Sequence, residues 1–167
     1  QALYKHGWSR FKQSLHRESL DSFFAVLDRQ LVSDGRVVSV TDLPKARGEP
    51  VEDARRAISL GFTYLEGVDS LDGYLDRRNA ATPYESLLYR NLGRLYLSQE
   101  RYHDAARTYH GYVERSPLAD DAPSLQVAVA NAFAAGGFTD RVLEAKVEFV
   151  ERFGFDGEWM AVRGGSA

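Results

Sequence analysis

Residues 84–117 carry two helical stripes separated by a short polar turn, and this spacing limits what the chain can fold into. The first stripe follows an i, i+4, i+7, i+8 pattern through Leu88, Leu92, Leu95 and Tyr96. The second stripe recurs at helical intervals through Tyr102, Ala105, Ala106, Tyr109, Tyr112 and Val113. Only the polar residues 98–101 (SQER) separate the stripes, so the two helices must be antiparallel neighbours. Pro117 ends the second helix.

The residue types inside these stripes resemble the tetratricopeptide (TPR) repeat. That family's pattern runs W-x2-L-G-x2-Y, then A-x3-F, then P, over about 34 residues. The chain fills these positions in one register with Tyr89, Leu92, Gly93, Tyr96, Ala105, Tyr109 and Pro117. Packing accounts for the pattern, because small residues at Gly93 and Ala105 allow two helices to cross closely. The tyrosines fill the gaps to the next helix pair.

Looser copies of the same pattern occur elsewhere in the chain. Gly61 precedes Gly93 by 32 residues, and Val129 takes the glycine position 36 residues after it. The resemblance therefore implies an all-α fold, a right-handed superhelical stack (α-solenoid) of about four TPR-like hairpins. We expect these hairpins at about residues 2–31, 50–79, 84–116 and 120–153. Together they are expected to form a single TPR-like domain over 1–167, as a fragment of a longer chain.

The stretch 32–49 is an insertion between the first and second hairpins. It holds an Asp34–Gly35 turn signal. The β-branched residues beside this turn are Val37, Val38 and Val40. Together they predict a small hairpin or an extended loop. We expect Pro50 at the start of the next helix, the position that proline tolerates best, and an irregular or short helical cap over 154–167.

Charge and composition exclude several classes of partner. The 21 basic and 24 acidic residues give a formal net charge of −3, so we expect no nucleic-acid binding. The chain has no cysteine, hence no disulfide and no zinc–thiolate site. Its most apolar stretch, 127–138, is far shorter than the ~20 residues of a transmembrane helix. We therefore expect a soluble chain without direct membrane insertion.

No residue pattern indicates catalysis, a cofactor or a metal. The four histidines form no HExxH pattern and no i, i+4 pair of histidines. His103 and His110 share a helix face, but the intervening Arg107 would oppose a cation there. Gly136–Gly137 follows alanines and is typical of a helix C-cap and turn, not of a phosphate loop. We therefore expect a chain that is not an enzyme and that has no cofactor and no metal site.

The resemblance implies a binding groove instead. In TPR proteins the first helix of each hairpin lines a concave wall, and the register of this chain places aromatic and basic residues there. We expect the peptide- or partner-binding residues to be Tyr4, Lys5, Trp8, Phe11, Lys12, Phe62, Arg90, Asn91 and Arg94. Aromatic and arginine side chains are enriched at binding hot spots. The clamp that holds acidic C-terminal peptides in some family members is absent, because Tyr4, Trp8 and Ser59 stand at three of its positions.

These features predict a non-enzymatic protein–protein interaction scaffold that binds a peptide or a partner helix in the aromatic and basic groove. The alternative is a self-association (oligomerisation) module of a larger envelope assembly protein, because solenoid ends expose apolar faces unless they are capped. The uneven repeats resemble those of TPR proteins of the Gram-negative cell envelope. That resemblance suggests a bacterial protein of the periplasm.

Overall fold

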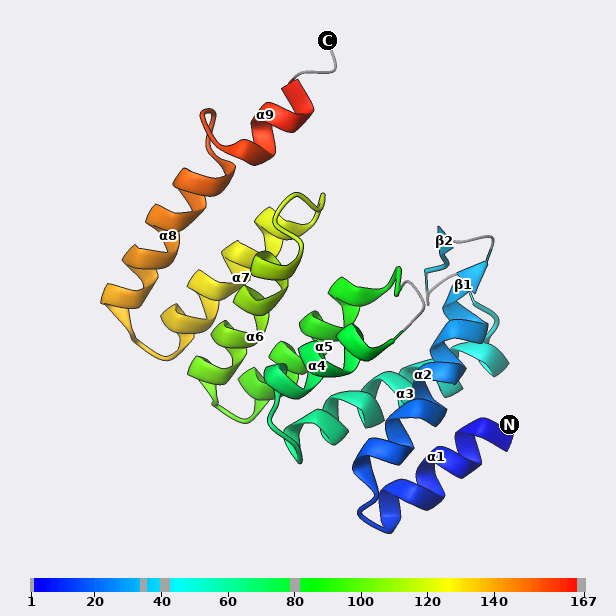
Figure 1. The fold of residues 1–167 in the computed structure, drawn as a ribbon. Helices are drawn as coiled ribbons and strands as arrows, with labels where there is room; N and C mark the ends of the chain where they lie inside the picture. The colour runs from blue at the N-terminus through cyan, green and yellow to red at the C-terminus, as the bar shows by residue number, and fades with distance from the viewer. Residues whose placement is uncertain (1, 34–35, 40–42, 79–81, 165–167) are drawn as a thin grey trace. The chain divides into compact units, whose positions relative to one another are not determined.

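The structure is a computed structural model of the 167-residue chain. It describes residues 2–33, 36–39, 43–78 and 82–164. These residues are mostly helical, and their strands form one short antiparallel pair (Figure 1). The expected all-α character is therefore confirmed. The chain divides into two compact units, 1–92 and 93–167, with the division inside a helix. The stacking of all hairpins into one solenoid stays a prediction.

The first unit is built from successive helices that pack on their neighbours. They are α1 (Ala2–Lys12), α2 (His16–Leu31), α3 (Lys45–Thr63), α4 (Val68–Arg77) and the part of α5 (Glu85–Ser98) up to Leu92. Helix α2 packs against both α1 and α3, α3 contacts α4, and α1 also reaches α3. Figure 1 shows α1 to α3 in the blue and cyan part of the chain.

The core of the first unit is centred on the apolar face of α2. Phe23, Phe24 and Leu27 are fully buried there, at the spacing of one helical turn. Gly7 of α1 lies directly over this face, because a Cβ added to it would stand 2.8 Å from Cε1 of Phe23. A side chain at Gly7 would therefore push α1 away from α2.

A polar cluster ties α2 to the segment that follows α4. The guanidinium of Arg78 donates from Nη2 to both carboxylate oxygens of Asp28, at 3.0 and 2.9 Å. The hydroxyl of Tyr84 donates to the same carboxylate. Burial, together with this hydrogen bond, raises the pKa of Tyr84 well above its ordinary value. The cluster holds helices that lie far apart in the sequence, and no local spacing indicates it.

The insertion forms the small hairpin that its valines predict. Strand β1 (Val32–Ser33) pairs antiparallel with β2 (Arg36–Val37), with Val32 opposite Val37. Val37 is 44% exposed, so it does not enter the core. Three residues of the predicted turn and strand, Asp34, Gly35 and Val40, lie outside the described residues.

The start of the second hairpin needs a correction. Helix α3 begins at Lys45, so Pro50 lies inside the helix and not at its first position. The backbone N–H groups of Arg47 and Gly48 both donate to the carbonyl of Pro44. These hydrogen bonds begin the helix several residues before Pro50. Proline has no N–H, so the carbonyl of Ala46 receives no helical hydrogen bond from residue 50. The expected insertion of 32–49 is therefore shorter and ends before Lys45.

The second unit, from Gly93 onward, is also built from helices that pack on their neighbours. Its helices are the rest of α5, α6 (Tyr102–Arg115), α7 (Ala122–Ala135), α8 (Thr139–Phe153) and α9 (Glu158–Gly164). Helix α7 packs between α6 and α8. Gly93 lies where α5 meets α6, as its small size predicts, and the group nearest to it is the ring of Tyr109. Ala105 of α6 is fully buried.

The C-terminal cap contains the short helix α9. The indole Nε1 of Trp159 donates to the carbonyl of Ala119 at 2.8 Å, and the ring also packs edge-on against Phe153. The guanidinium carbon of Arg163 lies 3.8 Å from the centre of the Trp159 ring. These contacts attach α9 to the loop before α7 and to the end of α8. Residues 165–167 of the expected cap lie outside the described residues.

Candidate functional site

In the first unit, polar side chains link the helices that begin successive predicted hairpins, namely α1, α3 and α5. The hydroxyl of Tyr4 on α1 donates to Oδ2 of Asp53 on α3 at 2.7 Å. Further along α3, Nη2 of Arg55 donates to Oδ1 of Asn91 on α5 at 2.8 Å. We call the surface formed by Tyr4, Asp53, Arg55 and Asn91 the first-helix face. Its two hydrogen bonds join α1 to α3 and α3 to α5.

Arg55 and Asn91 form the most enclosed part of the first-helix face. The side chain of Arg55 is only 12% exposed and forms an ion pair with Glu52, 2.6 Å from Nη1 to Oε1. Nδ2 of Asn91 is buried and has no hydrogen-bond partner among the described residues. The Oδ1 of Asn91 accepts from Arg55 and so holds the guanidinium in place.

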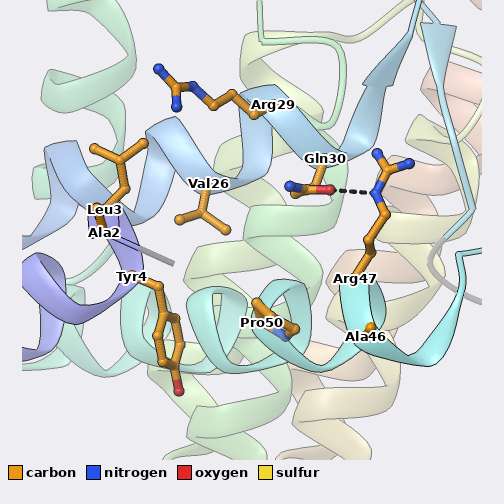
Figure 2. A pocket seen from close by; sticks show the side chains of 9 residues that line it. All are labelled: Ala2, Leu3, Tyr4, Val26, Arg29, Gln30, Ala46, Arg47 and Pro50. Atoms are coloured by element: carbon orange, nitrogen blue, oxygen red, sulfur yellow. Dashed lines mark hydrogen bonds between the residues drawn. The ribbon is translucent and has the colours of Figure 1, made fainter.

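A cavity of about 310 Å³ adjoins Tyr4, at the end of the first-helix face. Its lining comes from the start of α1, the end of α2 and the start of α3. Figure 2 shows Tyr4 on one side and the hydrogen bond from Nε of Arg47 to Oε1 of Gln30, 2.6 Å long, on the other. The hydrogen bond to Asp53 raises the pKa of Tyr4 above its ordinary value.

The aromatic side chains of α1 that are predicted to bind a partner also pack against other rings inside the first unit. The ring of Trp8 meets the rings of Phe11 and Phe23, each at 5.5 Å between ring centres. Phe11 also packs edge-on against Tyr64, the residue that follows α3. Both Trp8 and Phe11 remain half-buried, whereas Lys5 and Lys12 of the same helix are exposed. The two lysines are therefore the most accessible of the predicted residues on α1.

The placement of Phe62 in a groove needs correction. Phe62 is 1% exposed, and its ring packs edge-on against Phe24 of α2 and Tyr74 of α4. The side chain thus lies inside the first unit, where no partner can reach it. The sequence register located Phe62 on α3 but could not tell which side of that helix α2 and α4 would cover.

The predicted residues of α5 fall on both sides of the division between the units. Arg90 is half-buried and belongs to the first unit with Asn91. Arg94 is exposed and belongs to the second unit, so it is not part of the first-helix face as defined above. The grouping of the other eight predicted residues in one groove, without the buried Phe62, stays a prediction.

A second surface feature is a groove in the second unit between α6 and α8. A cavity of about 510 Å³ lies over α7, with Val129 and Phe133 among its lining. The polar residues of this α6–α8 groove are His103, Arg107, His110, Arg141, Glu144 and Glu148. His103 packs on the rings of Phe133 and Phe138 at one end.

The other end of the α6–α8 groove is closed by charged side chains. Nε2 of His110 lies 2.9 Å from Oε1 of Glu148, and Nε of Arg152 lies 2.9 Å from the same oxygen. Partial burial alone would raise the pKa of Glu148, but the hydrogen bonds from His110 and Gln126 and the charge of Arg152 outweigh it. The pKa of Glu148 is therefore below its ordinary value.

Sequence reasoning missed the ion-paired residues of the first-helix face and the carboxylates of the α6–α8 groove. The run 47–56 has mixed charge, which favours a solvated helix face, yet Arg55 is held between Glu52 and Asn91. The spacing His110-x3-Glu114 places two polar side chains on one face of α6 and could have drawn attention to the second surface. Glu148 comes from another helix, and nothing in its local sequence indicates that it meets His110.

Comparison with known proteins adds no relative. No protein-family model, curated protein or solved structure matches the chain. Among the described residues, no helix has both the length and the apolar composition needed to cross a membrane. The TPR resemblance therefore stays a prediction, and a function has to be argued from the two surfaces themselves.

Proposed function

We propose that the chain is a non-enzymatic protein-interaction scaffold built from TPR-like hairpins, and that its first unit binds a peptide or a partner helix on the first-helix face. The observation that carries the proposal is the pair of cross-helix hydrogen bonds, Tyr4–Asp53 and Arg55–Asn91. They fix polar groups from three helices in one preformed surface. Preorganised groups cost less entropy on binding than mobile ones.

The chemistry of the face fits a polypeptide ligand. A peptide presents carboxylates, which can pair with arginine. The cavity beside Tyr4 can take an apolar anchor from the same ligand, since Leu3, Val26 and Pro50 line it. The exposed lysines Lys5 and Lys12 on α1 add positive charge and favour an acidic segment.

Peptide selection on the intact chain tests this function. Peptides recovered from a displayed random library would be titrated against the wild-type chain by fluorescence anisotropy. We expect Arg55→Ala and Asn91→Ala each to raise Kd by about tenfold or more, as for hot-spot residues. Arg56→Ala is the matched control, because Arg56 is the next residue of α3, has the same charge and is exposed.

Melting temperatures of the same variants separate lost contacts from lost folding. If no library yields a binder, or if all three variants bind as the wild type does, the first-helix face is not the binding surface. Equal weakening by Arg56→Ala would indicate a general charge effect and would also count against the proposal.

Self-association is a second candidate, favoured by one face of α8. Leu143, Val147 and Val150 recur at helical spacing and are 64%, 50% and 66% exposed. An apolar stripe of this kind is typical of a helix that packs against another chain or a further hairpin.

Light scattering on the intact chain at high concentration tests the second candidate. We expect a mass above that of the 18.7 kDa monomer, which Val147→Glu should reduce to the monomer value. Val127→Glu is the control, because Val127 of α7 is also exposed, at 45%, and lies off the stripe. A monomeric wild-type chain would exclude this candidate.

A further inference from the structure

We propose that His110, Glu114 and Glu148 of the second unit form a binding site for a divalent transition-metal cation, with Zn²⁺ as the best fit. One donor atom from each residue lies within 4.8 Å of the other two. Nε2 of His110 is 2.9 Å from Oε1 of Glu148 and 3.6 Å from Oε1 of Glu114. Tetrahedral zinc with bonds of ~2.0–2.1 Å places its donor atoms about 3.3 Å apart, between these two distances.

The helices hold these donors in position. His110 and Glu114 are one turn apart on α6, so they share a face, and Glu148 faces them from α8. Because the three side chains already converge, a cation could be bound by small side-chain rotations without a change in the backbone. One imidazole nitrogen and two carboxylates suit zinc better than Mg²⁺ or Ca²⁺, which prefer ligand sets made of oxygen alone.

The buried side-chain amide of Gln126 orients one ligand of the site. Gln126 of α7 is fully buried, and its Nε2 donates to Oε2 of Glu148 at 3.0 Å and to the carbonyl of Ala145 at 3.2 Å. Its Oε1 is buried without a hydrogen-bond partner among the described residues. The amide therefore points at Glu148 and fixes that carboxylate with its other oxygen toward His110. Metal-binding carboxylates are commonly oriented by such outer hydrogen bonds.

The α6–α8 groove gives the site access to solvent. His110 and Glu148 both line the cavity of about 510 Å³. A water molecule in this space could complete a tetrahedral set made of three protein donors and one solvent oxygen.

Arg152 marks the cluster as a place that holds a cation, and it would compete with the metal. Its guanidinium pairs with Oε1 of Glu148, 2.9 Å from Nε, and with Oε1 of Glu114. These are the two oxygens that the metal would use. The Arg152 side chain is 33% exposed at the edge of the cluster, so it can turn toward solvent when a metal replaces it. If the cluster is a metal site, removing Arg152 should strengthen zinc binding. If it is only an ion-pair network, removing Arg152 should leave zinc binding unchanged or weaker.

The test uses the intact chain after treatment with a chelator. Zn²⁺ is titrated by calorimetry, and Co²⁺ is titrated by its visible absorption, which reports nitrogen and oxygen coordination. We expect one equivalent to bind and Arg152→Gln to tighten binding by about tenfold, because a unit charge close to the metal is removed. His110→Ala should weaken binding by about tenfold or more. His103→Ala is the matched control, since His103 lies in the same groove but outside the cluster.

Several outcomes would overturn the site. Unchanged or weaker zinc binding by Arg152→Gln would show that the cluster is only an ion-pair network. Equal losses from His103→Ala and His110→Ala would indicate scattered surface binding. Circular dichroism checks that each variant is folded, and His110→Gln replaces His110→Ala if the alanine variant is not. Zinc should also raise the melting temperature of folded Arg152→Gln, because a ligand that binds the native state stabilises it, and no rise would contradict the proposal.

Discussion

Replacing Phe62 by alanine is expected to lower the free energy of unfolding by about 3–5 kcal/mol, the usual cost of removing a buried phenylalanine. Phe62 is 1% exposed and lies between the rings of Phe24 and Tyr74. The substitution removes apolar area from the core and leaves a cavity that three different helices line. Urea denaturation followed by circular dichroism measures the loss.

Tyr64→Ala is the control for this prediction. Tyr64 lies two residues after Phe62, is 63% exposed, and stacks on the ring of His16 at 4.7 Å. Its loss removes two ring contacts at the surface, with His16 and with Phe11, and should cost about 1 kcal/mol. If Phe62→Ala proved as mild as Tyr64→Ala, Phe62 would be accessible after all, and its assignment to a binding groove would be restored.

Phe62 shows how far the sequence could predict this fold. Periodicity locates helices because an apolar stripe must be buried, and the turn of residues 98–101 is too short to allow anything but adjacent helices. The same periodicity does not say which neighbour covers a given side chain. A phenylalanine on α3 fits a groove wall and a core equally well, and only the positions of α2 and α4 decide between them.

Polar contacts between helices are the part of the candidate site that the sequence could not supply. Asp28 meets Arg78 and Tyr84, and Tyr4 meets Asp53, although about fifty residues of chain separate the members of each pair. Such contacts depend on the tertiary arrangement, so a local charge pattern does not indicate them. Pro50 shows a related limit, because its preference for a helix start was outweighed by the turn at Pro44.

The second large effect is expected at Gly93, where alanine should lower the free energy of unfolding by about 1–3 kcal/mol. An added Cβ would lie 2.3 Å from Cε1 and 2.5 Å from Cζ of Tyr109. These distances are well inside van der Waals contact, so α5 or the ring must move. The ring has little room, because Tyr109 is 4% exposed.

Helix propensity alone predicts that Gly93→Ala would raise the free energy of unfolding, so the measured sign decides between propensity and close packing. Alanine is favoured over glycine inside a helix by about 1 kcal/mol, so a glycine with free space around it should gain stability on substitution. Gly73 of α4 is that glycine, since an added Cβ would meet only the mobile end of Arg77, with Nη1 at 3.3 Å. In parallel urea titrations we expect Gly73→Ala to stabilise the chain and Gly93→Ala to destabilise it. A gain at both positions would mean that α5 and α6 do not approach closely at Gly93, and the packing reason for the TPR-like pattern of residues 89–117 would be lost.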